Sequence, residues 1–157
     1  MFVLIVIILL VVGFSVFSSL SKKGNSALVD VYAYQTELVR VTGLGIVSAV
    51  DPTLRIQTST INSFSSSDLK NTTDFLAKSG KKMTKLEASS RLDAKLEANL
   101  KAATTRNSFD EEFKSALEST SANYKLALKK ALANAGSKSE TAILQTAADN
   151  ILTFEDL

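Results

Sequence analysis

An apolar segment at residues 2–20, FVLIVIILLVVGFSVFSSL, constrains the fold more than any other part of the sequence. It holds no charged residue, and as a helix rising ~1.5 Å per residue it is roughly 28 Å long, close to the ~30 Å hydrocarbon core of a bilayer. A helix in a soluble core normally shows a polar face over five turns, and this segment shows none. The segment therefore predicts a single transmembrane helix.

The predicted anchor covers residues 1–23, and residues 24–157 are expected to form one helical-bundle domain. Lys22 and Lys23 follow the apolar segment, where their ammonium groups would reach lipid headgroups. No basic residue precedes Phe2 and no small-residue cleavage site follows, so we expect the segment to be retained rather than removed as a signal peptide. The predicted bilayer-facing residues are Phe2, Val3, Leu4, Ile5, Val6, Ile7, Ile8, Leu9, Leu10, Val11, Val12, Phe14, Val16, Phe17 and Leu20.

The charges beside the anchor and the composition of the domain favour opposite orientations. Two lysines after the segment favour a cytoplasmic domain by the positive-inside tendency. The Ser/Thr-rich, cysteine-free domain favours the other side, and we expect a single-pass membrane protein with an extracytoplasmic bundle. The expected partners are the lipid bilayer and other membrane or envelope proteins, with further copies of the chain among the candidates.

The missing residue types exclude most catalytic chemistry. Without Cys, His or Trp, the chain cannot build a Cys–His pair, a Ser–His–Asp triad or a histidine-containing metal site. The net charge of +2 comes from interspersed signs, so nucleic-acid binding is not expected. A carboxylate-only metal site is a weaker hypothesis than solvated charges, and it would draw on Glu37, Asp74, Glu112 and Glu118. We therefore expect no enzyme, no metal and no cofactor.

The pattern after residue 24 predicts an all-α domain. One helical face recurs at three- and four-residue steps over the first helix. Gly43 and Gly45 on that helix indicate either a bend or a place where another helix approaches closely, and we favour the close approach. Asp51-Pro52 predicts a capped helix start, and Ser79-Gly80 predicts its end. The face of the first helix is Leu28, Val31, Gln35, Leu38, Thr42, Ile46 and Ala49.

Three later helices are each predicted to begin with a capping box, a Ser or Thr followed three residues later by Glu. The box Thr84–Glu87 predicts a helix that continues past residue 103, supported by the pairs 87–91 and 97–101. The box Ser108–Glu111 predicts a helix over 109–132, and the box Ser137–Glu140 predicts one over about 138–153. The tail, residues 154–157, is expected to fray.

The order of these elements resembles a bacterial family of unknown function that forms a ferritin-like four-helix bundle and is usually exported. The resemblance covers about 34–151 and rests on YQTELVRVTGLG, on DPTLRIQTSTINSFSSSDLKNTTDFLAKSG, on SSRLDAKLEANLKAAT and on NSFDEEFKSALESTSANYKLALKKALANAGS. It implies an antiparallel ferritin-like bundle behind the transmembrane helix. Members tend to carry His in the long helices and this chain has none, which argues against a metal role.

Three functions are candidates on this basis. The first is a non-catalytic, membrane-anchored bundle with a structural or accessory role in the cell envelope. The second is a filament subunit resembling a type IV pilin, although Ile5 stands where such subunits carry Glu and no sheet is predicted. The third, ligand binding between the helices, is disfavoured because the aromatic residues have core spacing. These residues are Tyr32, Tyr34, Phe64, Phe75, Phe109, Phe113 and Tyr124.

Overall fold

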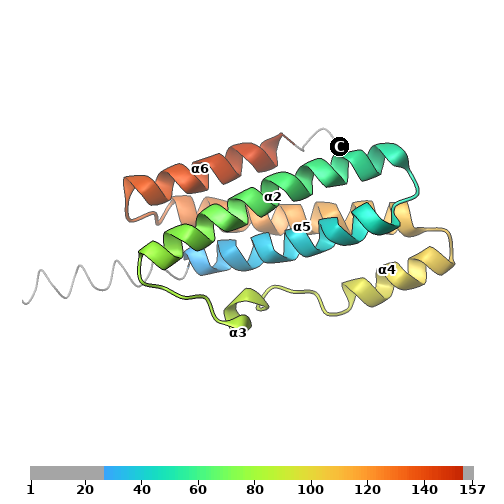
Figure 1. Ribbon diagram of the computed structural model, residues 1–157. Coiled ribbons are helices and arrows are strands. Elements are labelled where there is room, and N and C mark those ends of the chain that lie inside the picture. Colours follow the sequence, from blue (N-terminus) through green and yellow to red (C-terminus); the bar gives the residue numbers. More distant parts are fainter. Residues whose placement is uncertain (1–26, 154–157) are drawn as a thin grey trace, which may run out of the picture.

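The computed structural model describes residues 27–153, and within this range the chain is helical without any strand (Figure 1). The all-α prediction is confirmed for these residues. A first helix covers 27–48. It is followed by α2 (Pro52–Lys78), α3 (Lys85–Ala88), α4 (Leu96–Thr105), α5 (Phe109–Leu132) and α6 (Lys138–Leu152).

The predicted single-pass membrane architecture and location are wrong for the part of the chain that the structure describes. None of the helices within 27–153 combines the length and the apolar character that a bilayer crossing needs. Their outward faces carry Lys, Glu, Ser and Thr. The predicted anchor, residues 2–20 with Lys22 and Lys23, lies outside the described residues.

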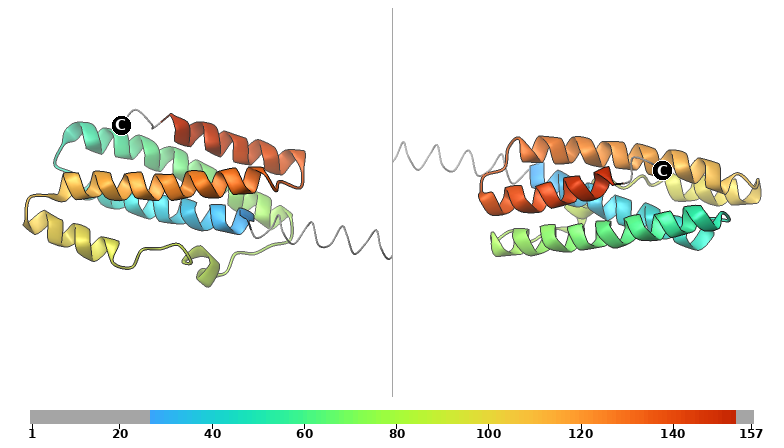
Figure 2. Two further views of the ribbon diagram at one scale, coloured as in Figure 1. Left: turned by 180° about the vertical axis from the view of Figure 1, so that it is seen from behind. Right: turned by 90° about the horizontal axis from the view of Figure 1, so that it is seen from above.

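Four long helices form a bundle, and α4 lies beside it against α5. The first helix runs antiparallel to α2, while α2 and α5 run in the same direction and are joined by the long crossover that contains α3 and α4 (Figures 1 and 2). The last helix, α6, contacts both α2 and α5. Seen from above, α6 ends partway along its two neighbours (Figure 2, right). Within residues 27–153, the bundle therefore has four helices at one end and three at the other.

Both predicted boundaries of α2 are confirmed. The side chain of Asp51 accepts hydrogen bonds from the backbone N–H groups of Thr53 (2.8 Å) and Leu54 (3.4 Å), and Pro52 begins the helix. At the other end, Gly80 has a φ of 77°, the left-handed conformation that glycine adopts without strain. The helix thus starts and stops where its sequence signals stand.

The two glycines of the first helix have different surroundings. A Cβ on Gly45 would lie 2.1 Å from Cζ of Phe113, whereas nothing lies within 4 Å of a Cβ on Gly43. The predicted close approach is therefore confirmed at Gly45 and wrong at Gly43. The buried ring of Phe113 stacks on Phe109, with ring centroids 5.6 Å apart, and this pair fixes the start of α5 against the first helix.

The continuous helix predicted from residue 84 past residue 103 is wrong. The chain forms only one turn, α3, and then an irregular connector, residues 89–95, before α4 begins. Glu37 of the first helix accepts a hydrogen bond from the backbone N–H of Asp93 (3.0 Å), and Asp93 in turn accepts from Lys95 N (2.9 Å) and Leu96 N (3.2 Å). These tertiary and local bonds satisfy donors that a continuous helix would have used.

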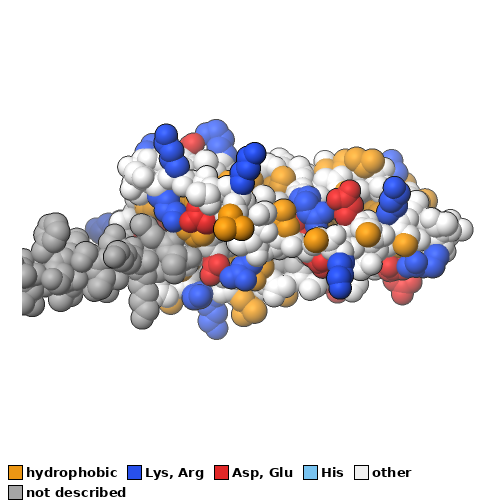
Figure 3. Space-filling view, turned by 90° about the horizontal axis from the view of Figure 1, so that it is seen from below, with side chains coloured by type: hydrophobic (Ala, Val, Ile, Leu, Met, Phe, Trp, Pro, Cys, Tyr) orange, Lys and Arg blue, Asp and Glu red, His pale blue; other side chains and the backbone are white. Residues whose placement is uncertain are grey.

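The charged pairs predicted along that helix are also replaced by others. Arg91 binds Asp30 of the first helix at 2.8 Å, and Glu97 lies 3.5 Å from Arg40. Glu87 pairs with Lys81 at 2.9 Å. On the face that carries α3 and α4, charged side chains of both signs are interspersed (Figure 3). The connector is therefore held to the first helix by side chains far apart in the sequence.

The three capping boxes have three outcomes. Thr84 and Glu87 form the complete reciprocal box. Ser137 accepts a bond from Glu140 N (3.1 Å), but the carboxylate of Glu140 accepts from Gly136 N (2.8 Å) instead of Ser137 N. Ser108 makes no cap, because its hydroxyl donates to Glu112 (2.7 Å). Even so, α5 begins at the predicted residue, and α6 ends within one residue of the prediction.

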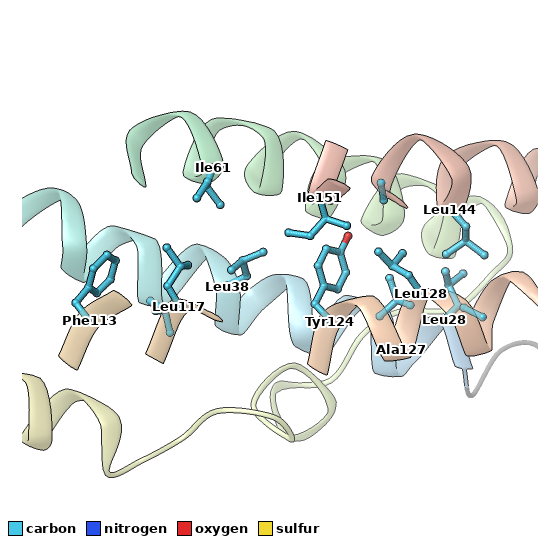
Figure 4. Close-up of a cluster of buried hydrophobic side chains, with 14 of the residues drawn as sticks. Leu28, Leu38, Ile61, Phe113, Leu117, Tyr124, Ala127, Leu128, Leu144 and Ile151 are labelled. Carbon is cyan, nitrogen blue, oxygen red and sulfur yellow. The ribbon is translucent and has the colours of Figure 1, made fainter. Parts of the chain in front are cut away.

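The core is apolar on the first helix, α5 and α6, but largely polar on α2. Figure 4 shows the apolar part, with Leu28, Leu38, Phe113, Tyr124 and Leu144 pointing into it. Of the predicted core aromatics, Phe109, Phe113 and Tyr124 are buried, while Phe64 is 41 % exposed. The buried positions of α2 are Leu54, Thr58, Ile61, Ser65, Asp68, Thr72 and Leu76. Such a face gains little from hydrophobic burial, so its neighbours must hold α2 in place.

Candidate functional site

The four acids that could have formed a carboxylate-only metal site do not converge. Glu37 is buried and binds Arg40 through two hydrogen bonds of 2.7 and 2.8 Å. Asp74 pairs with Lys70 on the surface of α2, and Glu112 binds Ser108 and Arg106. Within residues 27–153, no three acids, histidines or cysteines lie close enough to hold a metal ion.

A groove lies between α2 and α5, and we call it the α2/α5 groove. It encloses about 570 Å³ and is lined by Leu54, Gln57, Thr58, Ile61, Lys114, Leu117, Glu118, Ser121, Ala122 and Lys125. Its length along α5, from Lys114 to Lys125, is roughly 16 Å at ~1.5 Å per residue. The volume lies within the ~300–1,000 Å³ of typical ligand sites.

The groove exists because α6 is shorter than its neighbours. Asn150, in the last turn of α6, donates a hydrogen bond of 2.9 Å to Asp68, which lies in the middle of α2. The helix then ends at Leu152, so the first half of α2 has no α6 residue opposite it. In Figure 4, Ile61 and Leu117 lie to one side of Ile151, and Leu144 lies on the other. The groove is therefore the half of the fourth helix position that no residue among 27–153 fills.

The floor of the groove is apolar and its walls are charged. Leu54, Ile61 and Leu117 are 4 %, 1 % and 7 % exposed and belong to the hydrophobic core. Lys114 and Lys125 line the two ends of the α5 wall. An occupant with apolar groups toward the floor and acidic groups toward α5 matches this arrangement.

Two further polar residues, one on α2 and one on α5, also line the groove. Glu118 lies between the two lysines on α5 and makes the wall less basic. Thr58 is buried, and its hydroxyl has no hydrogen-bond partner among residues 27–153. An unsatisfied buried hydroxyl costs about 1–3 kcal/mol, so an occupant that reached this hydroxyl with a polar atom would be favoured.

A buried polar network lies beyond the end of the groove, under α6. Gln35 donates a hydrogen bond of 2.9 Å to the hydroxyl of Tyr124, and both side chains are almost completely buried. Burial raises the pKa of Asp68 to about 6, and the hydrogen bond from Asn150 opposes this shift. Burial also raises the pKa of Tyr124, and the nearby Asp68 adds to the rise. The hydrogen bond between Gln35 and Tyr124 links the first helix to α5, and the one between Asn150 and Asp68 links α6 to α2.

A second opening of about 130 Å³ lies on the other side of α5, between the first helix and the connector. Tyr34, Glu37 and Arg91 are among its lining residues, and the guanidinium of Arg91 stands 5.4 Å from the ring centroid of Tyr34. These side chains hold the connector to the bundle through the bonds described above. This opening is a small gap where the connector packs against the bundle, and its volume is below that of typical ligand sites.

Of the four candidate carboxylates, Glu118 lines the α2/α5 groove and Glu37 lines the second opening, while the predicted anchor lies outside the described residues. The lining of the α2/α5 groove carries one weak sequence signal, the short length of the last helix relative to the other long ones. Comparisons of this chain with protein-family models, with curated proteins and with solved structures found no match. The ferritin-like resemblance therefore stays a prediction.

Proposed function

We propose that this protein is a non-catalytic helical bundle that acts by binding a partner protein, and that the partner inserts a short amphipathic acidic segment into the α2/α5 groove. The observation that carries the proposal is the half of the fourth helix position that the described residues leave unfilled, a strip of core between two helices that is wide enough for a helix. An amphipathic helix laid into an apolar groove is a common mode of peptide recognition.

The dimensions and charges of the groove specify the segment. A helical segment of about three turns matches the roughly 16 Å between Lys114 and Lys125. Apolar side chains at three- and four-residue steps would cover Ile61 and Leu117, and acidic side chains on the flank would approach the two lysines. This is an accessory or structural role, in which the bundle works by contact.

The surroundings of the buried ionisable groups support a non-catalytic role. Glu37 is held by Arg40 and by a backbone N–H, and Asp68 is held by Asn150 under α6, away from the groove. The crossover between α2 and α5 supports the ferritin-like resemblance in topology alone. The alternative of a pilin-like filament subunit depends on residues 1–20 and stays a prediction.

The test uses two synthetic helical peptides of about three turns with the same leucine pattern. One carries glutamates beside the leucines and the other carries lysines. Fluorescence anisotropy at low salt, measured on the full chain, is expected to show at least tenfold tighter binding of the acidic peptide. The double variant Lys114→Glu, Lys125→Glu is expected to reverse this preference.

The matched control places the same bulky charge inside and outside the groove. Ala122→Arg narrows the groove and is expected to weaken binding of the acidic peptide, whereas Ala142→Arg, on the exposed face of α6, is expected to leave binding unchanged. Equal binding of the two peptides, or equal effects of the two arginine substitutions, would contradict the proposal. The absence of binding at millimolar peptide would contradict it as well.

A further inference from the structure

We infer that α6 is a pH-dependent cover on α2 and α5, which stays closed while the buried carboxyl of Asp68 is protonated and opens locally when that carboxyl ionises. The opening is a property of the fold and does not depend on what binds the α2/α5 groove. Its consequence for partner binding rests on the proposed function, because an open α6 lengthens that groove.

Asp68 belongs to a buried cluster to which each of the four long helices contributes one side chain. Asp68 of α2 is buried and accepts a hydrogen bond of 2.9 Å from Asn150 of α6. Tyr124 of α5 accepts one of 2.9 Å from Gln35 of the first helix. Figure 4 shows the hydroxyl of Tyr124 pointing toward Ile151 of α6. We call Gln35, Asp68, Tyr124 and Asn150 the polar cluster, and α6 closes it.

Within residues 27–153, the polar side chains that the other three long helices place in this cluster are uncharged at neutral pH. Asn150 and Gln35 are amides, and Asn150 supplies one hydrogen bond to the carboxyl. Tyr124 is the titratable group that acts on Asp68 from α5. Its burial, and then the nearby Asp68, raise its pKa, so it stays neutral at physiological pH. A buried carboxylate with one neutral donor is costly to ionise.

The charged groups on the same helices do not remove this cost. Those nearest to the cluster in sequence are Glu37 on the first helix, Lys70 on α2, Lys125 on α5 and Asp149 on α6. Glu37 is held by Arg40, and Asp149 is exposed. Lys70 pairs with Asp74 on the surface of α2, and Lys125 lines the α2/α5 groove. Burial therefore prevails and raises the pKa of Asp68 to about 6, against the hydrogen bond from Asn150.

The raised pKa belongs to the closed state, so closing and protonation of Asp68 favour each other. When α6 opens, water reaches the carboxyl and its pKa returns toward the ordinary 3.8. The closed state is then most favoured below about pH 4, and this advantage is lost as the pH rises through about 6. Linkage between the two pKa values makes opening about tenfold easier at pH 7 than at pH 5.

The opening is local because α6 is held by few apolar side chains. Its buried apolar residues are Leu144, Ala147 and Ile151, whereas α5 buries two phenylalanines, a tyrosine and two leucines. Ile151 is adjacent to Asn150 in the sequence, so the bond to Asp68 lies within this small contact. Elements with few buried apolar contacts open at lower free energy than the rest of a fold. The loop 133–137 joins α6 to α5 and allows this movement.

An open α6 changes the binding surface that the bundle offers. The helix contacts both α2 and α5, and its departure adds the strip beneath it to the α2/α5 groove. A partner segment longer than about three turns then needs the open state, and its apparent affinity falls with the fraction of chains that are open. Ionisation of Asp68 therefore favours longer partner segments.

Local opening is tested by hydrogen exchange of the full chain in low concentrations of urea. Amides of α6, such as Leu144 and Ala147, are expected to exchange at lower opening free energy and with a smaller urea dependence than Leu128 of α5. After correction for intrinsic rates, exchange of α6 should speed about tenfold from pH 5 to pH 7. The same opening free energy and urea dependence in α6 and α5 would overturn the inference.

The role of the carboxyl is tested with Asp68→Asn, which keeps an acceptor for Asn150 and cannot ionise. At pH 7 its α6 amides are expected to exchange about a hundredfold more slowly than those of the unaltered chain, without the pH dependence. Asp149→Asn, which removes an exposed carboxyl beside Asn150, is the matched control and should change neither. Unchanged exchange in Asp68→Asn, or equal effects of the two substitutions, would overturn the inference.

The consequence for binding is tested at pH 7 with the acidic three-turn peptide and with a six-turn peptide that continues its leucine pattern. Asp68→Asn is expected to lower the affinity of the longer peptide, by at most about a hundredfold, and to leave the shorter one unchanged. Equal effects on both would overturn this consequence. If neither peptide binds while α6 exchange depends on Asp68, the proposed function fails and the opening stands. If the shorter peptide binds while α6 exchange is independent of Asp68, the inference fails and the proposed function stands.

Discussion

Replacing Gly45 by alanine is expected to destabilise the bundle, although alanine favours a helix more than glycine does. The added Cβ would lie 2.1, 2.6 and 2.7 Å from three ring atoms of Phe113. Carbon atoms need ~3.5 Å, so the ring would have to move by about 1.4 Å. The ring is completely buried, and its neighbour Phe109 is also buried, so this movement disturbs packing on both sides.

The magnitude follows from two opposing effects. Overpacking a core costs about 1–3 kcal/mol, and contact with three ring atoms places this site at the upper end. The higher helix propensity of alanine relative to glycine offsets about 1 kcal/mol of this cost. The free energy of unfolding is therefore expected to fall by about 2 kcal/mol. Gly43→Ala is the matched control, with no atom near its Cβ, and it is expected to raise the free energy of unfolding by about 1 kcal/mol.

The assay is urea unfolding followed by far-ultraviolet circular dichroism, with the two alanine variants measured in parallel. A third arm repeats Gly45→Ala in a Phe113→Ala background, which by itself should lose about 3–5 kcal/mol. Without the ring, Gly45→Ala should become neutral or stabilising, a coupling of about 2–3 kcal/mol between the two positions. Equal effects of the Gly43 and Gly45 substitutions, or no coupling to Phe113, would refute the packing argument.

Three further predictions concern the remaining elements. The pKa of Asp68 is raised to about 6 in the folded chain from an ordinary 3.8. Its contribution to the free energy of unfolding should therefore fall by about 3 kcal/mol as the pH rises through this range. The variant Asp68→Asn should not show this loss in urea unfolding between pH 4 and 7. An unchanged pH dependence in this variant would contradict the assignment. Asp51→Ala should lower the free energy of unfolding by about 1 kcal/mol, because α2 loses its N-cap. Ser108→Ala removes no cap and should lower it by less in the same assay. Equal losses would contradict the assignment of Asp51 as a cap and Ser108 as none. Glu37→Gln should speed amide hydrogen exchange in the connector, residues 89–95. Glu97→Gln, which changes an exposed ion pair, should leave this exchange unchanged. Equal exchange in the two variants would show that Glu37 does not hold the connector.

Local signals predicted the long helices well because each boundary is decided by residues close in sequence. Asp51-Pro52 and Gly80 fix the two ends of α2 through backbone groups within a few residues of them. The inward face of the first helix followed from spacing alone, and nearly all of its predicted residues are buried. In these places the local preference and the packed structure agree.

Prediction failed where a bond between distant residues decided the structure. Nothing near Asp93 in the sequence indicates that the Glu37 carboxylate accepts a hydrogen bond from its backbone N–H, so local spacing predicts helix through the connector. Ser108 fits a capping box by spacing, but its hydroxyl binds Glu112 instead. The buried face of α2 has the sequence pattern of a solvent-exposed face, because Thr58, Asp68 and Thr72 are polar. Only the packing of the other helices against them shows that these side chains are buried.

The groove was missed for the same reason. It depends on how far α6 reaches along α2, which is set by the register between Asn150 and Asp68 and has no signature in either helix alone. The predicted single-pass membrane architecture drew on one segment, residues 2–20, and no helix within the described residues has comparable apolar length. The proposed function therefore depends on the helical bundle alone.

The most direct test of the central claim is chemical-shift mapping of the acidic helical peptide on the full, isotopically labelled chain. We expect the perturbed backbone amides to cluster along the α2/α5 groove, at Leu54, Ile61, Leu117 and Ser121, while amides in the first half of α6, such as that of Leu144, stay unchanged. Perturbations centred on the α3 and α4 face, or no perturbation at saturating peptide, would contradict the claim that this groove is the binding site.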